Sequence, residues 1–154
     1  MVAIGSAHKG GHAVFRRILV PSDGSEHALK AVRVAVDLAK EFDSEVVLLA
    51  VVPVPQTLVM VAGISEHVID DYIERAGRDA LQSALDVFEE AGLGVEVKIE
   101  VGSAGEEILR QAQEAGVDVI VMGKRGLGGV KGLLLGSVSN RVTHGAPIPV
   151  LLIP

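Results

Sequence analysis

Short apolar runs alternate with helix-like segments along this chain from residue 17 to residue 153. In the clearest run, residues 45–52, every position after Glu45 is apolar, and residues 117–122 contain a single polar residue. Unbroken apolar runs of this length are typical of strands buried on both faces of a parallel sheet. Consecutive parallel strands need a crossover connection, which is usually a helix. The alternation therefore constrains the chain to an α/β fold with a parallel sheet.

Five strands and four helices are predicted. The strands are expected at residues 18–21, 45–52, 95–101, 117–122 and 150–153. Ser25, Ser65 and Ser103 are expected to cap the first three helices, and Ser103 with Glu106 has the spacing of a capping box. A fourth helix is expected at residues 137–144. Right-handed crossovers then favour a single-domain, open five-stranded sheet of order 3-2-1-4-5 with helices on both faces.

The segment at residues 53–64, between the second strand and the long helix, is predicted to be a loop of unusual apolarity. Twelve residues is long for a plain connector, and such loops are often functional. We expect this loop either to fold over a ligand or to pack against a second subunit. The alternative is a loop that folds back on its own domain.

Composition limits the classes of function. A formal net charge of −6 opposes nucleic acid as the main partner, and the absence of cysteine excludes thiol catalysis and thiolate metal sites. Residues 1–15 have no long apolar core and are expected to form an N-terminal arm ahead of one domain at residues 16–154. Prolines interrupt the longest apolar region, residues 46–64, so no membrane-spanning segment and a cytoplasmic location are expected.

Glycine residues follow the fourth predicted strand at Gly123, Gly126 and Gly136, and Ser137 then opens a helix. Glycine lets the backbone approach a ligand closely, and the free amides of a helix start favour an anion. A second polar loop, residues 21–25, follows the first strand. Strands one and four are neighbours in the predicted order, so both loops would face one crevice. The sequence therefore predicts a phosphate-binding crevice at this edge of the sheet.

Other interpretations of these loops stay open. The glycine segment lacks the Walker A spacing and the dinucleotide spacing. The tetrapeptide at residues 123–126 also fits a KH loop, which clamps a nucleic-acid backbone but joins two helices. A glycine-rich turn without a ligand is a third interpretation. By spacing alone, Asp23 and Ser25 are as well explained as caps of the first helix.

The spacing G-x2-G-x9-G-[ST] in residues 123–137 resembles the ATP-binding branch of the universal stress protein family. The resemblance extends to the segments RRILVPSDGSEHALKAV, EVVLLAVVP, VDVIVMGKRGLGGVKGLLLGSVSNRV and APIPVLLIP, and so covers residues 16–154. It implies a fold of the adenine-nucleotide alpha-hydrolase type. It also implies a regulatory protein of the stress response that binds ATP or AMP, with Mg²⁺ accompanying ATP and with slow or no hydrolysis.

The resemblance also implies a role for each site residue. Asp23 would bind the ribose hydroxyls, Pro21 and Val51 would line the adenine pocket, and Met122 and Gly123 would lie near the sugar and base. Backbone amides and serine hydroxyls would hold the phosphates at Gly126, Gly136, Ser137, Val138 and Ser139. The cationic residues Lys124, Arg125 and Lys131 would either contact outer phosphates or be solvated loop charges.

The last predicted strand, Val150 to Ile153, is expected at a sheet edge, where an unpaired apolar edge invites self-pairing. The universal stress proteins commonly dimerise through this strand, so the resemblance implies a homodimer. Two rival functions share the same fold: a protein-interaction module that binds no nucleotide, and a weak ATPase. No catalytic pair of nucleophile and base is recognisable, so no catalytic residue is assigned.

Overall fold

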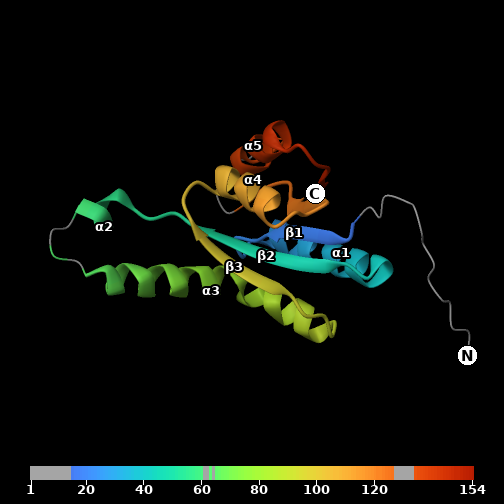
Figure 1. The fold of residues 1–154 in the computed structure, drawn as a ribbon, viewed down its shortest axis with the longest axis horizontal. Coiled ribbons are helices and arrows are strands. Elements are labelled where there is room, and N and C mark those ends of the chain that lie inside the picture. The colour runs from blue at the N-terminus through green and yellow to red at the C-terminus, as the bar shows by residue number, and fades with distance from the viewer. Residues whose placement is uncertain (1–14, 61–62, 64, 127–133) are drawn as a thin grey trace, which may run out of the picture.

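The computed structural model describes residues 15–60, 63, 65–126 and 134–154 (Figure 1). The predicted arm at residues 1–15 therefore lies outside the described residues except for Phe15. The strands are β1 (Arg17–Pro21), β2 (Glu45–Val52), β3 (Glu96–Val101), β4 (Val119–Gly123) and β5 (Val150–Ile153). The helices are α1 (Glu26–Phe42), α2 (Gln56–Met60), α3 (Glu66–Glu90), α4 (Ala104–Glu114) and α5 (Ser137–Gly145).

All five strands are parallel, and their order in the sheet is β3-β2-β1-β4-β5. The predicted α/β class and strand order are thus confirmed. Alternate residues of β1 point to opposite faces: Ile18 packs in a core with α1 and α3, whereas Leu19 packs in a core with α4 and α5. Helices therefore cover both faces, and the central strands are buried on both sides.

Local signals explain some helix boundaries but not others. The Ser25 hydroxyl accepts a hydrogen bond from the amide of Ala28 at 3.2 Å, as predicted for the cap of α1. Ser65 and Ser103 stand at the N-cap positions of α3 and α4, but neither side chain makes a capping hydrogen bond. The predicted capping box is therefore wrong. The carboxylate of Glu106 instead lies 3.8 Å from a guanidinium nitrogen of Arg141.

The predicted loop at residues 53–64 contains the short helix α2, so the prediction is wrong at those residues. Pro55 immediately precedes this helix, and its carbonyl accepts from the amide of Leu58 at 2.9 Å. A proline at a helix start is favourable because its φ is already helical. Figure 1 shows α2 and the first turns of α3 extending beyond the sheet.

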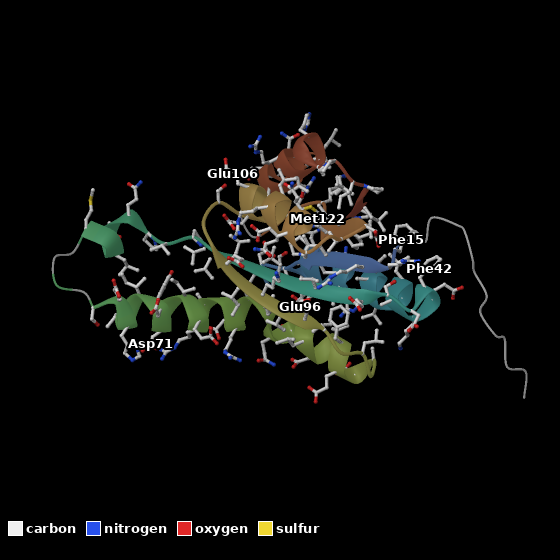
Figure 2. All side chains as sticks on the ribbon, in the orientation of Figure 1. Phe15, Phe42, Asp71, Glu96, Glu106 and Met122 are labelled. Atoms are coloured by element: carbon white, nitrogen blue, oxygen red, sulfur yellow. The ribbon has the colours of Figure 1, made fainter. Side chains whose placement is uncertain are left out.

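An aromatic pair lies at the end of the sheet where β1 begins. The rings of Phe15 and Phe42 lie with their centroids 5.4 Å apart beside the start of β1 (Figure 2). This contact ties the end of α1 to the residue that precedes β1. Within the described part of the chain, no helix is both long and apolar enough to cross a membrane.

Candidate functional site

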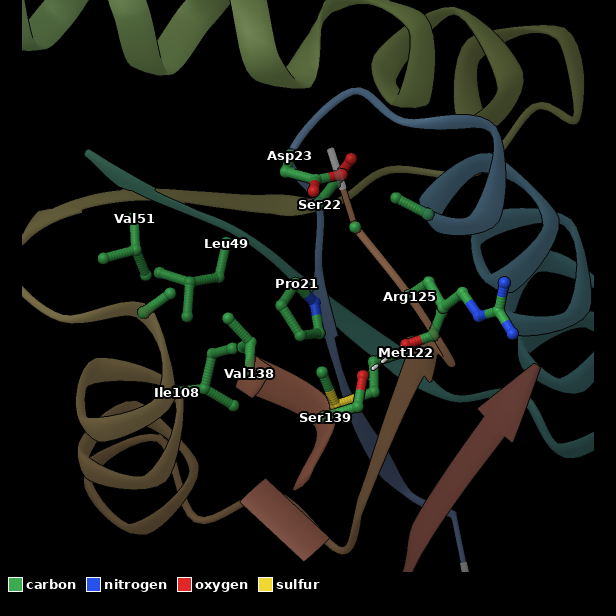
Figure 3. A pocket seen from close by; sticks show the side chains of 14 residues that line it. Pro21, Ser22, Asp23, Leu49, Val51, Ile108, Met122, Arg125, Val138 and Ser139 are labelled. Carbon is green, nitrogen blue, oxygen red and sulfur yellow. Dashed lines mark hydrogen bonds between the residues drawn. The ribbon is translucent and has the colours of Figure 1, made fainter. Parts of the chain in front are cut away.

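The carboxyl ends of β1 and β4 lie side by side, and the loops that leave them enclose a cavity of about 130 Å³ (Figure 3). After β1 the chain forms β2 and β3 on one side of β1 within the sheet, and it then returns to form β4 on the other side of β1. This is the switch point at which open α/β sheets bind ligands. The cavity is lined by residues of six elements and their loops: Pro21, Ser22, Asp23, Ala28, Leu49, Val51, Ala104, Ile108, Met122, Gly123, Arg125, Gly126, Val138 and Ser139.

One side of the cavity is apolar. Leu49 and Val51 lie two positions apart on β2 and therefore point to the same face of the sheet. Ile108 from α4 and Val138 from α5 lie on the same side of the cavity as these residues, whereas Asp23 and Arg125 lie away from them (Figure 3). We call this apolar side of the cavity the apolar slot. A flat apolar ring placed there would exchange contact with water for contact with aliphatic surface.

The acidic loop after β1 is ordered by its own hydrogen bonds. One carboxylate oxygen of Asp23 accepts from the amide of Ser25 at 2.9 Å, and the Ser22 hydroxyl contacts the carbonyl of Ala80 in α3 at 3.5 Å. Ser25, not Asp23, caps α1. Asp23 thus shapes the turn and still presents an exposed carboxylate at the cavity. The cap interpretation is therefore confirmed for Ser25 but not for Asp23.

Two glycines let the loops approach closely. A Cβ atom at Gly123 would lie 2.8 Å from the carbonyl carbon and oxygen of His27, in the first turn of α1. A Cβ atom at Gly126 would lie 2.5 Å from a carboxylate oxygen of Asp23. Any side chain at either position would force a neighbouring group to move. The glycine spacing therefore brings the loop after β4 against the loop after β1.

The start of α5 lies next to Gly126. Gly136 is the N-cap residue and has no side chain to cap the helix, and its own amide donates to the carbonyl of Lys124 at 3.0 Å. The Ser139 hydroxyl donates to the carbonyl of Gly123 at 2.8 Å, so its proton serves to join α5 to the end of β4. The first amides of α5 receive no side-chain cap, and the helix dipole makes this end attractive to an anion.

The structure brings together most of the residues predicted from sequence. All of the predicted site residues line the cavity except Gly136 and Ser137, which stand at the start of α5 beside it. Lys131 lies outside the described residues. Among the described residues, no group of three or more His, Cys, Asp or Glu side chains is placed to hold a metal ion.

The sequence reasoning missed five lining residues: Ser22, Ala28, Leu49, Ala104 and Ile108. Leu49 shares a strand face with Val51, and this two-residue spacing was a usable signal. Ala104 and Ile108 lie four positions apart at the start of α4, so they share a helix face that the sequence alone assigns to the core.

A model of the universal stress protein family matches residues 15–154. Among curated proteins, the chain is 34% identical over 150 residues to universal stress protein MJ0531 of Methanocaldococcus jannaschii, covering 97% of this chain and 88% of that protein. It is 36% identical over 147 residues to universal stress protein YxiE of Bacillus subtilis, covering 91% and 99%.

Solved structures share the fold. The structure of protein MJ0577 is similar with a TM-score of 0.78 at 30% identity, over 91% of this chain and 96% of that one. A universal stress protein in complex with cAMP has a TM-score of 0.65 at 24% identity, over 91% and 97%. The protein from Archaeoglobus fulgidus in complex with dAMP has a TM-score of 0.67 at 21% identity, over 92% and 99%. At those two identities the likeness concerns the fold alone.

Proposed function

This chain belongs to the universal stress protein family, and we propose that its crevice binds an adenine nucleotide, ATP or AMP. One observation carries the proposal: an apolar slot, the Asp23 carboxylate and the uncapped start of α5 meet around one cavity. A carboxylate accepts hydrogen bonds from two vicinal ribose hydroxyls, and charge-assisted bonds of this kind are strong. The start of a helix suits a phosphate.

In this proposal each side of the crevice takes one part of the ligand. Val51 and Pro21 line the base, and Met122 and Gly123 lie under the sugar. The cavity of about 130 Å³ is smaller than the roughly 300–1,000 Å³ typical of small-molecule sites. It would therefore enclose the base, and the phosphates would lie outside it, toward Gly126 and the first amides of α5. Mg²⁺ would accompany ATP on its phosphates.

Adenine is proposed as the base by analogy, since two proteins of the same fold were solved with the adenine nucleotides cAMP and dAMP. The proposed role is regulatory binding in a stress response, in the cytoplasm, with slow or no hydrolysis. The proposed assembly is a homodimer through β5. This strand pairs with β4 on one side, and its Leu151 is 38% exposed.

Thermal unfolding with and without nucleotide tests the proposal. At ATP one hundred times above its Kd, the stabilisation should be about 2.7 kcal/mol. For a domain of this size that raises Tm by about 5–11 °C. GTP should raise Tm less, because the backbone of Val51 is proposed to hydrogen-bond the edge of adenine, and guanine has a different edge. If neither nucleotide shifts Tm at millimolar concentration, the proposal is wrong.

A matched pair of glycine variants locates the effect. Gly126→Ala should fold normally, because the atom its Cβ meets is the end of the Asp23 side chain, which can turn aside. The turned carboxylate would no longer face the ribose, so the ATP-induced shift should shrink. Gly94→Ala, whose Cβ would meet nothing within 4 Å, should keep the full shift.

A further inference from the structure

The first turns of α3 extend beyond the sheet (Figure 1), and the eleven residues 66–76 precede the first buried residue of this helix, Gly77. All the buried residues of α3 come later: Gly77, Leu81, Ala84 and Phe88. We call residues 66–76 the overhang. Within the overhang Ile69, Ile73 and Ala76 are half-buried, and the other residues are exposed. The overhang is therefore a part of α3 that its own domain covers only in part.

The overhang carries an apolar ridge. Val68, Tyr72 and Ala76 are spaced four residues apart and so lie along one side of the helix. Val68 is 54% exposed and Tyr72 is 40% exposed. Met60 at the end of α2 is 81% exposed. Exposed large apolar side chains on one side of a projecting helix, here Val68 and Tyr72, are typical of an interaction surface.

A charged ridge runs beside the apolar one. It consists of Asp71, Arg75 and Asp79, again four residues apart, and all three side chains are exposed. The Asp71 carboxylate lies 3.8 Å from Nε2 of His67, and Arg75 is in no ion pair with any residue that the structure describes. Figure 2 shows Asp71 at the solvent side of the overhang.

The order of these charges is complementary to itself. If a second copy of the helix packs antiparallel about a two-fold axis at Ile73, Asp71 of each copy lies level with Arg75 of the other, because both are two residues from the axis. The same operation sets each apolar ridge against the other. Two-fold contacts require such self-complementarity.

From this juxtaposition we infer that the overhang is a self-association surface, on which the α3 helices of two copies of this chain pack antiparallel. The contact is about 16 Å long, since eleven residues rise about 1.5 Å each. A contact of that length buries less than a standard interface, so the association is weak and depends on protein concentration.

This surface is separate from the proposed β5 contact. In the sheet order β3-β2-β1-β4-β5, α3 packs on β2 and β3, whereas β5 is the opposite edge strand. A dimer through β5 would use the opposite edge of the sheet. The two contacts together would join dimers into a larger assembly, and the inference does not depend on nucleotide binding.

Disulfide trapping tests the geometry directly, because the chain has no cysteine of its own. Tyr72→Cys places the two thiols on facing ridges and only about 3 Å apart along the helices. For helix axes about 8–10 Å apart, facing Cα atoms with that offset fall near the separation of about 4.4–6.8 Å that a disulfide spans. Ser83→Cys is the control: it is exposed on the same helix, but twenty residues of rise, about 30 Å, would separate the two thiols. Oxidation of the full chain should give a covalent dimer for Tyr72→Cys alone.

Charge reversal then tests the register between copies. Two versions of the Tyr72→Cys chain are prepared, one that also carries Arg75→Asp and one that also carries Asp71→Arg, and tags of different mass distinguish them. Two copies of the same version would place like charges opposite each other, whereas one copy of each version restores both opposite-charge pairs. The mixture should give heterodimer about fivefold or more above either homodimer.

Equal trapping of Tyr72→Cys and Ser83→Cys would overturn the inference, and so would a statistical ratio of heterodimer to homodimers. An effect of the substitutions on folding alone cannot produce preferential heterodimers. Circular dichroism of each variant confirms that the helices are intact.

Discussion

Replacing Gly123 with alanine should displace the start of α1, and this displacement should both destabilise the fold and distort the crevice. The new Cβ would lie 2.8 Å from the carbonyl carbon and oxygen of His27. These are backbone atoms in the first turn of α1, so the helix start must move away from β4. Overpacking of this kind typically costs about 1–3 kcal/mol. The lost flexibility of the unfolded chain offsets about 0.4–1 kcal/mol.

The net loss should be about 1–2 kcal/mol in the free energy of unfolding, which lowers Tm by about 2–8 °C. Urea unfolding followed by circular dichroism measures it, and Gly94→Ala is the matched control. No atom lies within 4 Å of a Cβ at Gly94, so that variant should equal or exceed the parent in stability. Equal stability of the two variants would refute the argument that close packing requires Gly123.

Three further changes test separate parts of the account. Ser25→Ala removes the cap of α1 and should cost about 1 kcal/mol in urea unfolding, whereas no loss would show that the hydroxyl does not stabilise the helix. Gln111→Leu removes the part-buried hydrogen bonds that this buried side chain makes with Lys98 at 3.0 Å and Glu100 at 2.9 Å, and should cost about 1–3 kcal/mol by the same assay. Gly136→Val should fold, because its Cβ would have no atom nearer than 3.4 Å, but should weaken ATP binding at least tenfold, about 1.4 kcal/mol; unchanged affinity in calorimetry would mean that the phosphates lie elsewhere.

The sheet was predictable because its strands are buried on both faces and therefore stand out as apolar runs. The predicted bounds of β2 and β5 agree with the structure. The failures depend on tertiary contacts or on very short elements. Glu106 lies near Arg141, a neighbour distant in sequence that the capping-box spacing cannot reveal. Helix α2 has only five residues, too few for a helical period to show.

The candidate site was also predictable only in part. Glycine spacing identified the backbone part of the crevice, because close approach requires glycine at positions such as Gly123 and Gly126. The apolar lining was only partly predicted. Leu49 could have been added from its two-residue spacing to Val51, whereas Ile108 is buried like any core residue. Only the placement of α4 over the end of β2 reveals that Ile108 lines the cavity.

Calorimetric titration of ATP into the parent chain and into Asp23→Ala tests the central claim most directly. The account predicts one ATP site per chain, displacement of ATP by AMP, and at least tenfold weaker binding after Asp23→Ala, about 1.4 kcal/mol. Absence of binding to the parent at millimolar ATP, or equal affinity for parent and variant, would contradict the assignment of this crevice to an adenine nucleotide.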